Sequence, residues 1–205
     1  MEATLWLIAG ADGVGKTTYA LSRIEAVSGT NEFVNLDLIA QGLSPLNPSR
    51  QQTQAARYAL DMARDLIAQK QSFSLETTLS GKTHLRLVAL AKANNMAVKL
   101  LYFFVDTPEQ CLERVARRVS EGGHDVLEAD LRRRFARSLE NFSLYVKHCD
   151  FWRVYDANDR QPVTLAKGAF ELIAYDSSGP APSQLLQVFK REASGINSGF
   201  AAINR

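Results

Sequence analysis

The stretch Gly10-Ala-Asp-Gly-Val-Gly-Lys-Thr17 matches the phosphate-binding P-loop pattern G-x-x-x-x-G-K-T. The apolar run Leu5–Ala9 precedes it, and a helical stretch from Lys16 to about Val27 follows it, which is the strand–loop–helix context that the motif needs. In that context the backbone N–H groups of the loop point inward, and the positive end of the following helix adds to their field. The motif therefore predicts that this chain holds the phosphates of a nucleotide.

Each part of the loop has an expected contact. We expect Lys16 to reach the outer phosphates as a catalytic cation and the Thr17 hydroxyl to ligate Mg²⁺, so ATP and Mg²⁺ are the predicted cofactors. The predicted nucleotide-binding residues of this segment are Gly10, Ala11, Asp12, Gly13, Val14, Gly15, Lys16, Thr17 and Thr18.

The composition is ordinary for a globular protein, with 46% hydrophobic and 22% charged residues in a chain of 205. No apolar run approaches the ~20 residues of a membrane span, and the first residues lack the basic start of a signal peptide. Cys111 and Cys149 lack metal-ligand spacing, which favours reduced thiols in a cytoplasmic protein. The net charge of +2 is too small to indicate nucleic acid. We expect neither a membrane nor a nucleic acid as partner.

Strand-like and helix-like segments alternate, which favours a parallel sheet with helices on both faces. Strands are expected over 5–8, 33–36, 72–75, 98–105 and 152–155, and helices over 16–27, 49–69, 82–94, 108–121 and 129–145. The sequence thus predicts one doubly wound α/β domain of the P-loop type over residues 1–178, with five parallel strands in the order 2-3-1-4-5. A short hairpin is expected over 163–166 and 170–174, turning at Lys167-Gly168. Residues 179–205 are expected to be a tail with room for a short helix over 183–192.

Acidic residues follow two of the predicted strands, at the sheet edge where ligands bind in open α/β folds. Asp37 follows the second strand and Glu76 the third, so both are candidates to face Lys16. Phosphoryl transfer needs a carboxylate to orient the acceptor hydroxyl. Asp37 fits that role, and Glu76 fits either substrate binding or outer-shell Mg²⁺ ligation; Thr77 and Thr78 complete the predicted acceptor-binding group. A helix cap or a strand-end hydrogen bond is the competing interpretation of each acid.

Seven of the sixteen arginines fall between Arg114 and Arg137, on two predicted helices separated by Gly122-Gly-His-Asp-Val126. A helix–glycine–helix unit rich in arginine favours a mobile lid over the phosphates, spanning about residues 114–142. Arginine suits this role because it stays charged and binds phosphate oxygens bidentately. A solvated basic face is the competing interpretation.

Helical periodicity separates the arginines of the second lid helix. Its expected core stripe consists of Leu131, Phe135, Leu139 and Phe142. Arg132 and Arg134 flank this stripe and can border a cleft, whereas Arg133 and Arg137 point nearly the opposite way. His124, in the glycine turn, is more typical of a loop residue than of a catalyst.

Several stretches together resemble the zeta-toxin-like P-loop kinases, in particular their shorter bacterial members. The matching stretches are Ala9–Thr17, Val34–Pro45, Phe73–Gly81, Arg117–Val126, Leu131–Phe142 and Trp152–Asp156. The specific pair is Asn-x-Asp with Gly-Leu-Ser-Pro in the second stretch and Glu-Thr-Thr-Leu-Ser-Gly in the third, since the P-loop alone is common to many enzymes.

The resemblance implies ATP-dependent phosphorylation of a hydroxyl of a UDP-N-acetyl amino sugar. It implies Asp37 as general base, Glu76 as a substrate-binding acid, and Arg118 with the Arg132–Arg134 triplet as phosphate clamps. Arg118 and Arg134 are accordingly predicted to be catalytic, and Arg118, Arg133 and Arg134 to bind the nucleotide. A toxin–antitoxin role is also implied; because no antitoxin-like segment precedes the P-loop, a neutralising partner would be a separate chain.

Two other functions remain open on the sequence. The same scaffold serves kinases of nucleotides and other metabolites. A nucleotide-dependent regulatory ATPase would also use the P-loop, although a second acid at Glu76 argues mildly against it.

Overall fold

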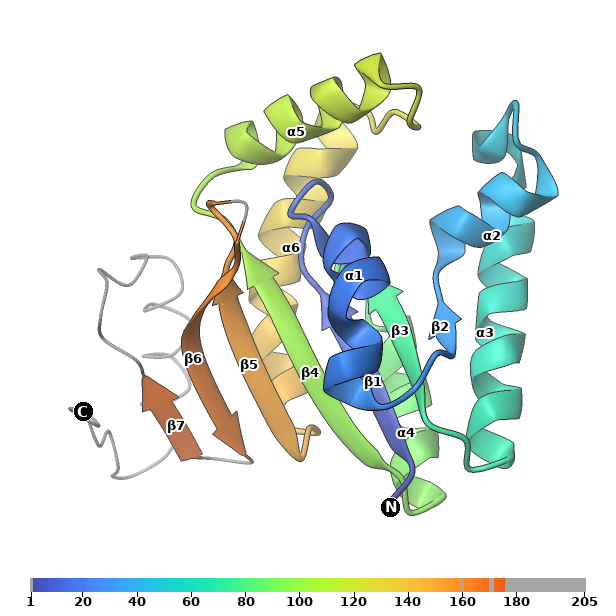
Figure 1. Cartoon of the computed structure of the whole chain (residues 1–205), viewed down its shortest axis with the longest axis vertical. Coiled ribbons are helices and arrows are strands. Elements are labelled where there is room, and N and C mark those ends of the chain that lie inside the picture. The colour runs from blue at the N-terminus through green and yellow to red at the C-terminus, as the bar shows by residue number, and fades with distance from the viewer. Residues whose placement is uncertain (1, 160, 170–171, 176–205) are drawn as a thin grey trace.

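One sheet organises the described part of the chain, which comprises residues 2–159, 161–169 and 172–175 of this computed structural model. The strands are β1 (Thr4–Ala9), β2 (Phe33–Val34), β3 (Phe73–Thr77), β4 (Ala97–Phe104), β5 (Phe151–Asp156), β6 (Val163–Ala169) and β7 (Leu172–Tyr175). They lie in the order β2-β3-β1-β4-β5-β6-β7 (Figure 1). The first five pair in parallel, which confirms the predicted order 2-3-1-4-5 and the α/β class.

The predicted hairpin is present as the antiparallel pair β6 and β7, but it extends the parallel sheet, so the sheet has seven strands and not the five predicted. The predicted turn at Lys167-Gly168 is also wrong, since both residues lie within β6. Gly168 pairs with Trp152 on one side and with Ile173 on the other. Ladder hydrogen bonds on both edges keep this glycine extended. The predicted tail at 179–205, with its helix over 183–192, lies outside the described residues.

Helices cover both faces of the sheet, with α1 on one face and α4 and α6 on the other (Figure 1). The helices are α1 (Lys16–Ser28), α2 (Leu36–Leu43), the 3₁₀ helix η1 (Pro48–Gln51), α3 (Gln52–Ala68), α4 (Thr83–Ala93), α5 (Pro108–Ser120) and α6 (Glu128–Val146). One apolar core packs α3, α4 and α6 against the sheet, and a second packs α1 and α5 against its other face. None of the described helices is long and apolar enough to cross a membrane.

Helix α2 was not predicted, and it shortens the second strand to Phe33–Val34. The cause is local: the side chain of Asn35 accepts a hydrogen bond from the Leu38 N–H at 3.0 Å and so caps a new helix directly after the strand. Asp37 therefore lies in the first turn of α2 and not in a loop.

Other helix boundaries follow their sequence signals. Thr107 caps α5 through a capping box with Gln110, and Pro108 occupies the first turn. In α6 the predicted stripe faces inward: Leu131 and Phe142 are buried, and Phe135 and Leu139 pack beside them.

Candidate active site

The P-loop leaves β1 in a conformation that depends on its glycines. Gly10 and Gly13 have φ angles of 139° and 82°, which disfavour any side chain. A Cβ at Gly10 would lie 2.4 Å from the Phe103 carbonyl oxygen, and one at Gly13 would lie 2.7 Å from that of Cys111. The loop is thus tightly packed against the end of β4 and the start of α5.

Lys16 is buried at the start of α1, with only 6% of its surface exposed. Its Nζ donates a hydrogen bond to the Ala11 carbonyl oxygen at 2.7 Å and lies 3.9 Å from Glu76 Oε1. The ammonium group is therefore held between the loop backbone and the end of β3, where phosphate oxygens can replace the carbonyl as its partner.

Glu76, near the end of β3, is joined to the P-loop by several short contacts. Thr17 Oγ1 donates to Glu76 Oε1 and Oε2, at 3.0 and 2.9 Å, and Asn35 Nδ2 donates to Oε2 at 2.7 Å. Burial raises the pKa of Glu76, while Lys16 and the Thr17 and Asn35 hydrogen bonds oppose this rise. The three neighbours thus offset only part of the cost of burying the charge of Glu76.

The Thr17 hydroxyl and the Glu76 carboxylate are suitable ligands for Mg²⁺. Both supply hard oxygen atoms, and their mutual hydrogen bond shows that they reach a common point. Among the described residues no group of three or more His, Cys, Asp or Glu side chains could hold a metal ion. A Mg²⁺ ion here would therefore rely on nucleotide oxygens and water for most of its ligands, as is usual for this ion.

Asp37 faces the same region from the first turn of α2. Its Oδ1 accepts a hydrogen bond from Gln52 Nε2 at 3.4 Å, and its Oδ2 lies 3.5 Å from His124 Nε2. The carboxylate thus has a partner from η1–α3 on one oxygen and a partner from the α5–α6 loop on the other.

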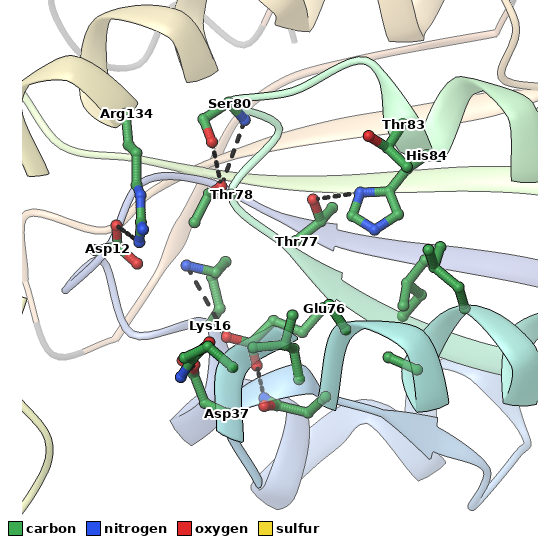
Figure 2. Close-up of a pocket in the computed structure, with 17 residues that line it drawn as sticks. Asp12, Lys16, Asp37, Glu76, Thr77, Thr78, Ser80, Thr83, His84 and Arg134 are labelled. Atoms are coloured by element: carbon green, nitrogen blue, oxygen red, sulfur yellow. Dashed lines mark hydrogen bonds and ion pairs between the residues drawn. The ribbon is translucent and has the colours of Figure 1, made fainter. Parts of the chain in front are cut away.

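These groups line one cavity of about 350 Å³. Its lining residues are Asp12, Lys16, Asn35, Leu36, Asp37, Gln52, Ala56, Ala59, Leu60, Leu75, Glu76, Thr77, Thr78, Ser80, Thr83, His84 and Arg134. Figure 2 shows Asp12 and Arg134 at one end of the cavity and Thr83 and His84 at the other. The cavity therefore joins the P-loop to a space walled by the apolar side of α3 and the start of α4.

His84 is fixed at the far end of the cavity by the segment that follows β3. Its Nδ1 lies 2.9 Å from Thr77 Oγ1, and that oxygen also accepts a hydrogen bond from the Leu79 N–H at 3.1 Å. Burial lowers the pKa of His84 and favours the neutral imidazole. A neutral ring held in this way can form one hydrogen bond with a ligand through its other nitrogen.

The lid helices α5 and α6 place their arginines differently. Arg134 lines the cavity and pairs with Asp12 of the P-loop at 3.2 Å. Arg133 instead pairs with Asp130 at 2.7 Å, and Arg132 with Glu109 at 2.7 Å and Glu128 at 2.8 Å; both are largely exposed. Arg118 donates to the His124 carbonyl oxygen at 2.9 Å. Among the arginines of the predicted lid, Arg134 is thus the one that lines the cavity.

Most of the predicted site residues meet at this edge of the sheet, but not all of them line the cavity. Asp12, Lys16, Asp37, Glu76, Thr77, Thr78 and Arg134 do so. The predicted residues that do not line it are Arg118, Arg133 and the P-loop residues Gly10, Ala11, Gly13, Val14, Gly15, Thr17 and Thr18. Sequence reasoning missed Asn35, Gln52 and His84. Asn35 had a signal, because an asparagine before an acidic first turn is a strong helix cap, whereas Gln52 and His84 had none.

Comparisons with known proteins identify the family and the fold of the chain. The sequence profile of the AAA domain family matches residues 5–142. The chain belongs to this AAA domain family. It is also 32% identical, over 126 residues, to an uncharacterized protein of Haemophilus influenzae; the match covers 62% of this chain and 88% of that protein.

Solved structures similar to this member of the AAA domain family share its fold at low sequence identity. The PezAT chromosomal toxin–antitoxin system of Streptococcus pneumoniae superposes with a TM-score of 0.61 at 13% identity, covering 95% of this chain and 86% of that one. The AvrRxo1-ORF1:-ORF2 complex with ATP gives a TM-score of 0.64 at 17% identity, covering 98% and 67%. The resemblance to zeta-toxin-like P-loop kinases is therefore confirmed at the level of the fold.

Proposed function

We propose that this protein is an ATP-dependent small-molecule kinase that phosphorylates a hydroxyl group of a UDP-N-acetyl amino sugar. The observation that carries the proposal is that Lys16, Asp37, Glu76 and Arg134, from four separate elements, line one cavity beside the P-loop. A phosphate-binding loop, a carboxylate base and a lid cation are the parts that phosphoryl transfer requires. A P-loop protein that only binds nucleotide has no need of the second carboxylate in an adjoining cavity.

In this proposal the position of each residue determines its role in the reaction. The P-loop amides and Lys16 hold the outer phosphates of ATP, and Asp37 accepts the proton of the acceptor hydroxyl as its oxygen attacks the γ-phosphorus and ADP leaves. Arg134 leaves its ion pair with Asp12 and binds the transferring phosphoryl group, whose negative charge it stabilises. A bound Mg²⁺ would neutralise negative charge on the β- and γ-phosphates.

For Glu76 the contacts favour the magnesium role over direct acceptor binding. Its two oxygens are engaged by Thr17 and Asn35, and Lys16 is close by, so the carboxylate faces the P-loop. Thr77 and Thr78 lie further along the same cavity and are better placed to bind the acceptor. This assignment matches the P-loop pattern of a hydroxyl and a strand-end acid around one Mg²⁺ ion.

The choice of acceptor rests on the resemblance and on the shape of the cavity. Its volume of about 350 Å³ fits a small molecule, and it combines the α3 side chains Ala56, Ala59 and Leu60 with polar groups. Because the fold is shared with toxin–antitoxin proteins, we also propose a cytoplasmic toxin role with a separate antitoxin chain as partner.

The test is a transfer assay with purified protein, Mg²⁺ and γ-labelled ATP. The acceptor panel contains UDP-N-acetylglucosamine, UDP-glucose, N-acetylglucosamine and the nucleoside monophosphates, and products are identified by mass spectrometry. The proposal expects a phosphorylated UDP-N-acetyl sugar. Turnover of a monophosphate alone would instead indicate a nucleotide kinase, and acceptor-independent hydrolysis alone would indicate a regulatory ATPase.

A further inference from the structure

His124 brings the lid into contact with the proposed catalytic base. It lies in the loop between α5 and α6, and its Nε2 atom is 3.5 Å from Asp37 Oδ2. The loop and α2 lie near one another at the carboxyl edge of the sheet (Figure 1). One ring nitrogen therefore joins the lid to the helix that carries Asp37.

The loop is shaped to present this ring. Gly122 has a φ of 88°, and a Cβ at Gly123 would lie 2.5 Å from Arg118 Cγ and 2.9 Å from the Arg118 carbonyl oxygen. The Gly123 N–H donates to that same oxygen at 2.8 Å. Arg118 Nη2 in turn donates to the His124 carbonyl oxygen at 2.9 Å. The two glycines and Arg118 thus fix the backbone conformation at His124.

The Nε2 atom of His124 lies between a donor on Arg118 and an acceptor on Asp37. Nε2 also lies 3.4 Å from Arg118 Nη2, but a guanidinium group can only donate, and an ionised carboxylate can only accept. Arg118 already has a shorter acceptor in the His124 carbonyl oxygen. In the form that carries a proton on Nε2, the ring can donate to Asp37.

The two oxygens of Asp37 then have partners on different elements. Gln52 Nε2 donates to Oδ1 from the start of α3, and His124 approaches Oδ2 from the lid. With both oxygens engaged, rotation of the carboxylate is restricted. When the loop moves away, Oδ2 loses its partner while Oδ1 keeps its own.

We infer that His124 is a positioning residue that orients the Asp37 carboxylate when the lid is closed. It links closure of the lid over the phosphates to the orientation of the Asp37 carboxylate. The carboxylate is aligned for catalysis only in the closed state. The effect of His124 on catalysis rests on the proposed kinase function. The contact between His124 and Asp37 does not depend on which acceptor is phosphorylated. Its test therefore begins with a measurement that needs no catalysis.

The first test is limited trypsin digestion of the full chain with Mg·ADP, following cleavage after Arg114, Arg117 and Arg118 by mass spectrometry. Removing the contact between His124 and Asp37 should open the lid more often, so His124→Ala is expected to raise the rate of these cleavages roughly two- to fivefold. His148→Ala, at an exposed position beyond α6, is the matched control and should cleave like the wild type.

Coupling to Asp37 is tested by repeating the digestion in an Asp37→Asn background. If His124 acts through Asp37, His124→Ala should add little to Asp37→Asn, so the two effects are not additive. Equal acceleration in both backgrounds, or none in either, would overturn the inference. Neither outcome depends on whether a phosphate acceptor is known.

The second test uses phosphoryl transfer to UDP-N-acetylglucosamine. His124→Ala should lower kcat roughly fivefold and leave the KM for ATP unchanged, because positioning acts on the base and not on the nucleotide. His124→Gln, which can still donate to Asp37, should recover part of the loss. A rise in the KM for ATP with unchanged kcat would contradict the positioning role. If no variant or wild type transfers phosphate, the kinase proposal fails, and the digestion still decides whether the contact exists.

Discussion

The Thr17 hydroxyl donates a hydrogen bond to both carboxylate oxygens of Glu76, at 3.0 and 2.9 Å. The contact joins the first turn of α1 to β3, the strand that pairs in parallel with β1. It brings the proposed Mg²⁺ ligand of the P-loop together with a buried acid whose charge favours a cation. The same contact therefore bears on both the stability and the function of the site.

Replacing Glu76 with Gln should separate these two effects. Because burial raises the pKa of Glu76, charging this carboxyl group costs more in the folded protein than in the unfolded chain, and the neutral amide should raise the thermal midpoint of the nucleotide-free protein in EDTA. The same variant should weaken Mg²⁺-dependent ATP binding by roughly 10- to 100-fold, the usual range for a lost metal-site partner.

Differential scanning fluorimetry and calorimetric titration measure the two effects. Glu32→Gln, at an exposed position just before β2, is the control and should change neither. A lowered midpoint of Glu76→Gln would contradict the burial argument. Binding of Mg·ATP as tight as that of the wild type would show that the magnesium role of Glu76 is wrong.

Arg134 and Arg133 offer a comparison between neighbours on one helix. Arg134 pairs with Asp12 of the P-loop, whereas Arg133 pairs with Asp130 on its own helix. We expect Arg134→Ala to lower kcat roughly 100-fold or more, because it removes a cation from the transferring phosphoryl group. Arg133→Ala should cost less than about threefold, since exposed pairs contribute little. Steady-state kinetics with Mg·ATP give both values, and similar losses in both variants would count against the assignment of Arg134.

His84 should make the stability of the protein depend on pH. Burial lowers the pKa of His84 in the folded state, so below its ordinary value of 6.5 the unfolded chain binds more protons than the folded one. The free energy of unfolding must therefore fall as the pH drops through that value. One unit below it, the contribution of this group is at most about 1.4 kcal/mol.

Urea unfolding at pH 7.5 and pH 5.5 tests this dependence. His84→Asn should lose less stability than the wild type between the two values, because it has no imidazole to protonate. His148→Asn, at an exposed position, should lose as much as the wild type. An equal loss in all three proteins would show that His84 is not the group responsible.

The five parallel strands could be predicted because each carries a local signal, and their order because few topologies fit alternating strands and helices. β1 is a buried apolar run before a P-loop, and the alternation with helices leaves few topologies for a parallel sheet. The extension by β6 and β7 could not, since Lys167-Gly168 resembles a turn unless the flanking ladders are known. Whether an extended glycine is stable there depends on partners distant in the sequence.

The candidate site was predictable where strand ends alone place a residue. Glu76 and Lys16 follow from that rule, and Arg134 follows from the apolar stripe of α6. The contact between His124 and Asp37 joins a loop to a helix that no local pattern brings together. Residues such as Gln52 and His84 enter the cavity through tertiary packing, which a single sequence does not encode in any short pattern.

The central claim is that Asp37 serves as the base for phosphoryl transfer to a sugar hydroxyl. The most direct measurement is the single-turnover rate of transfer from Mg·ATP to UDP-N-acetylglucosamine by the wild type and by Asp37→Asn, with ATP affinity measured in parallel. The account predicts that transfer falls by a factor of roughly 100 or more while ATP binds as before. Transfer by Asp37→Asn at the wild-type rate would contradict it.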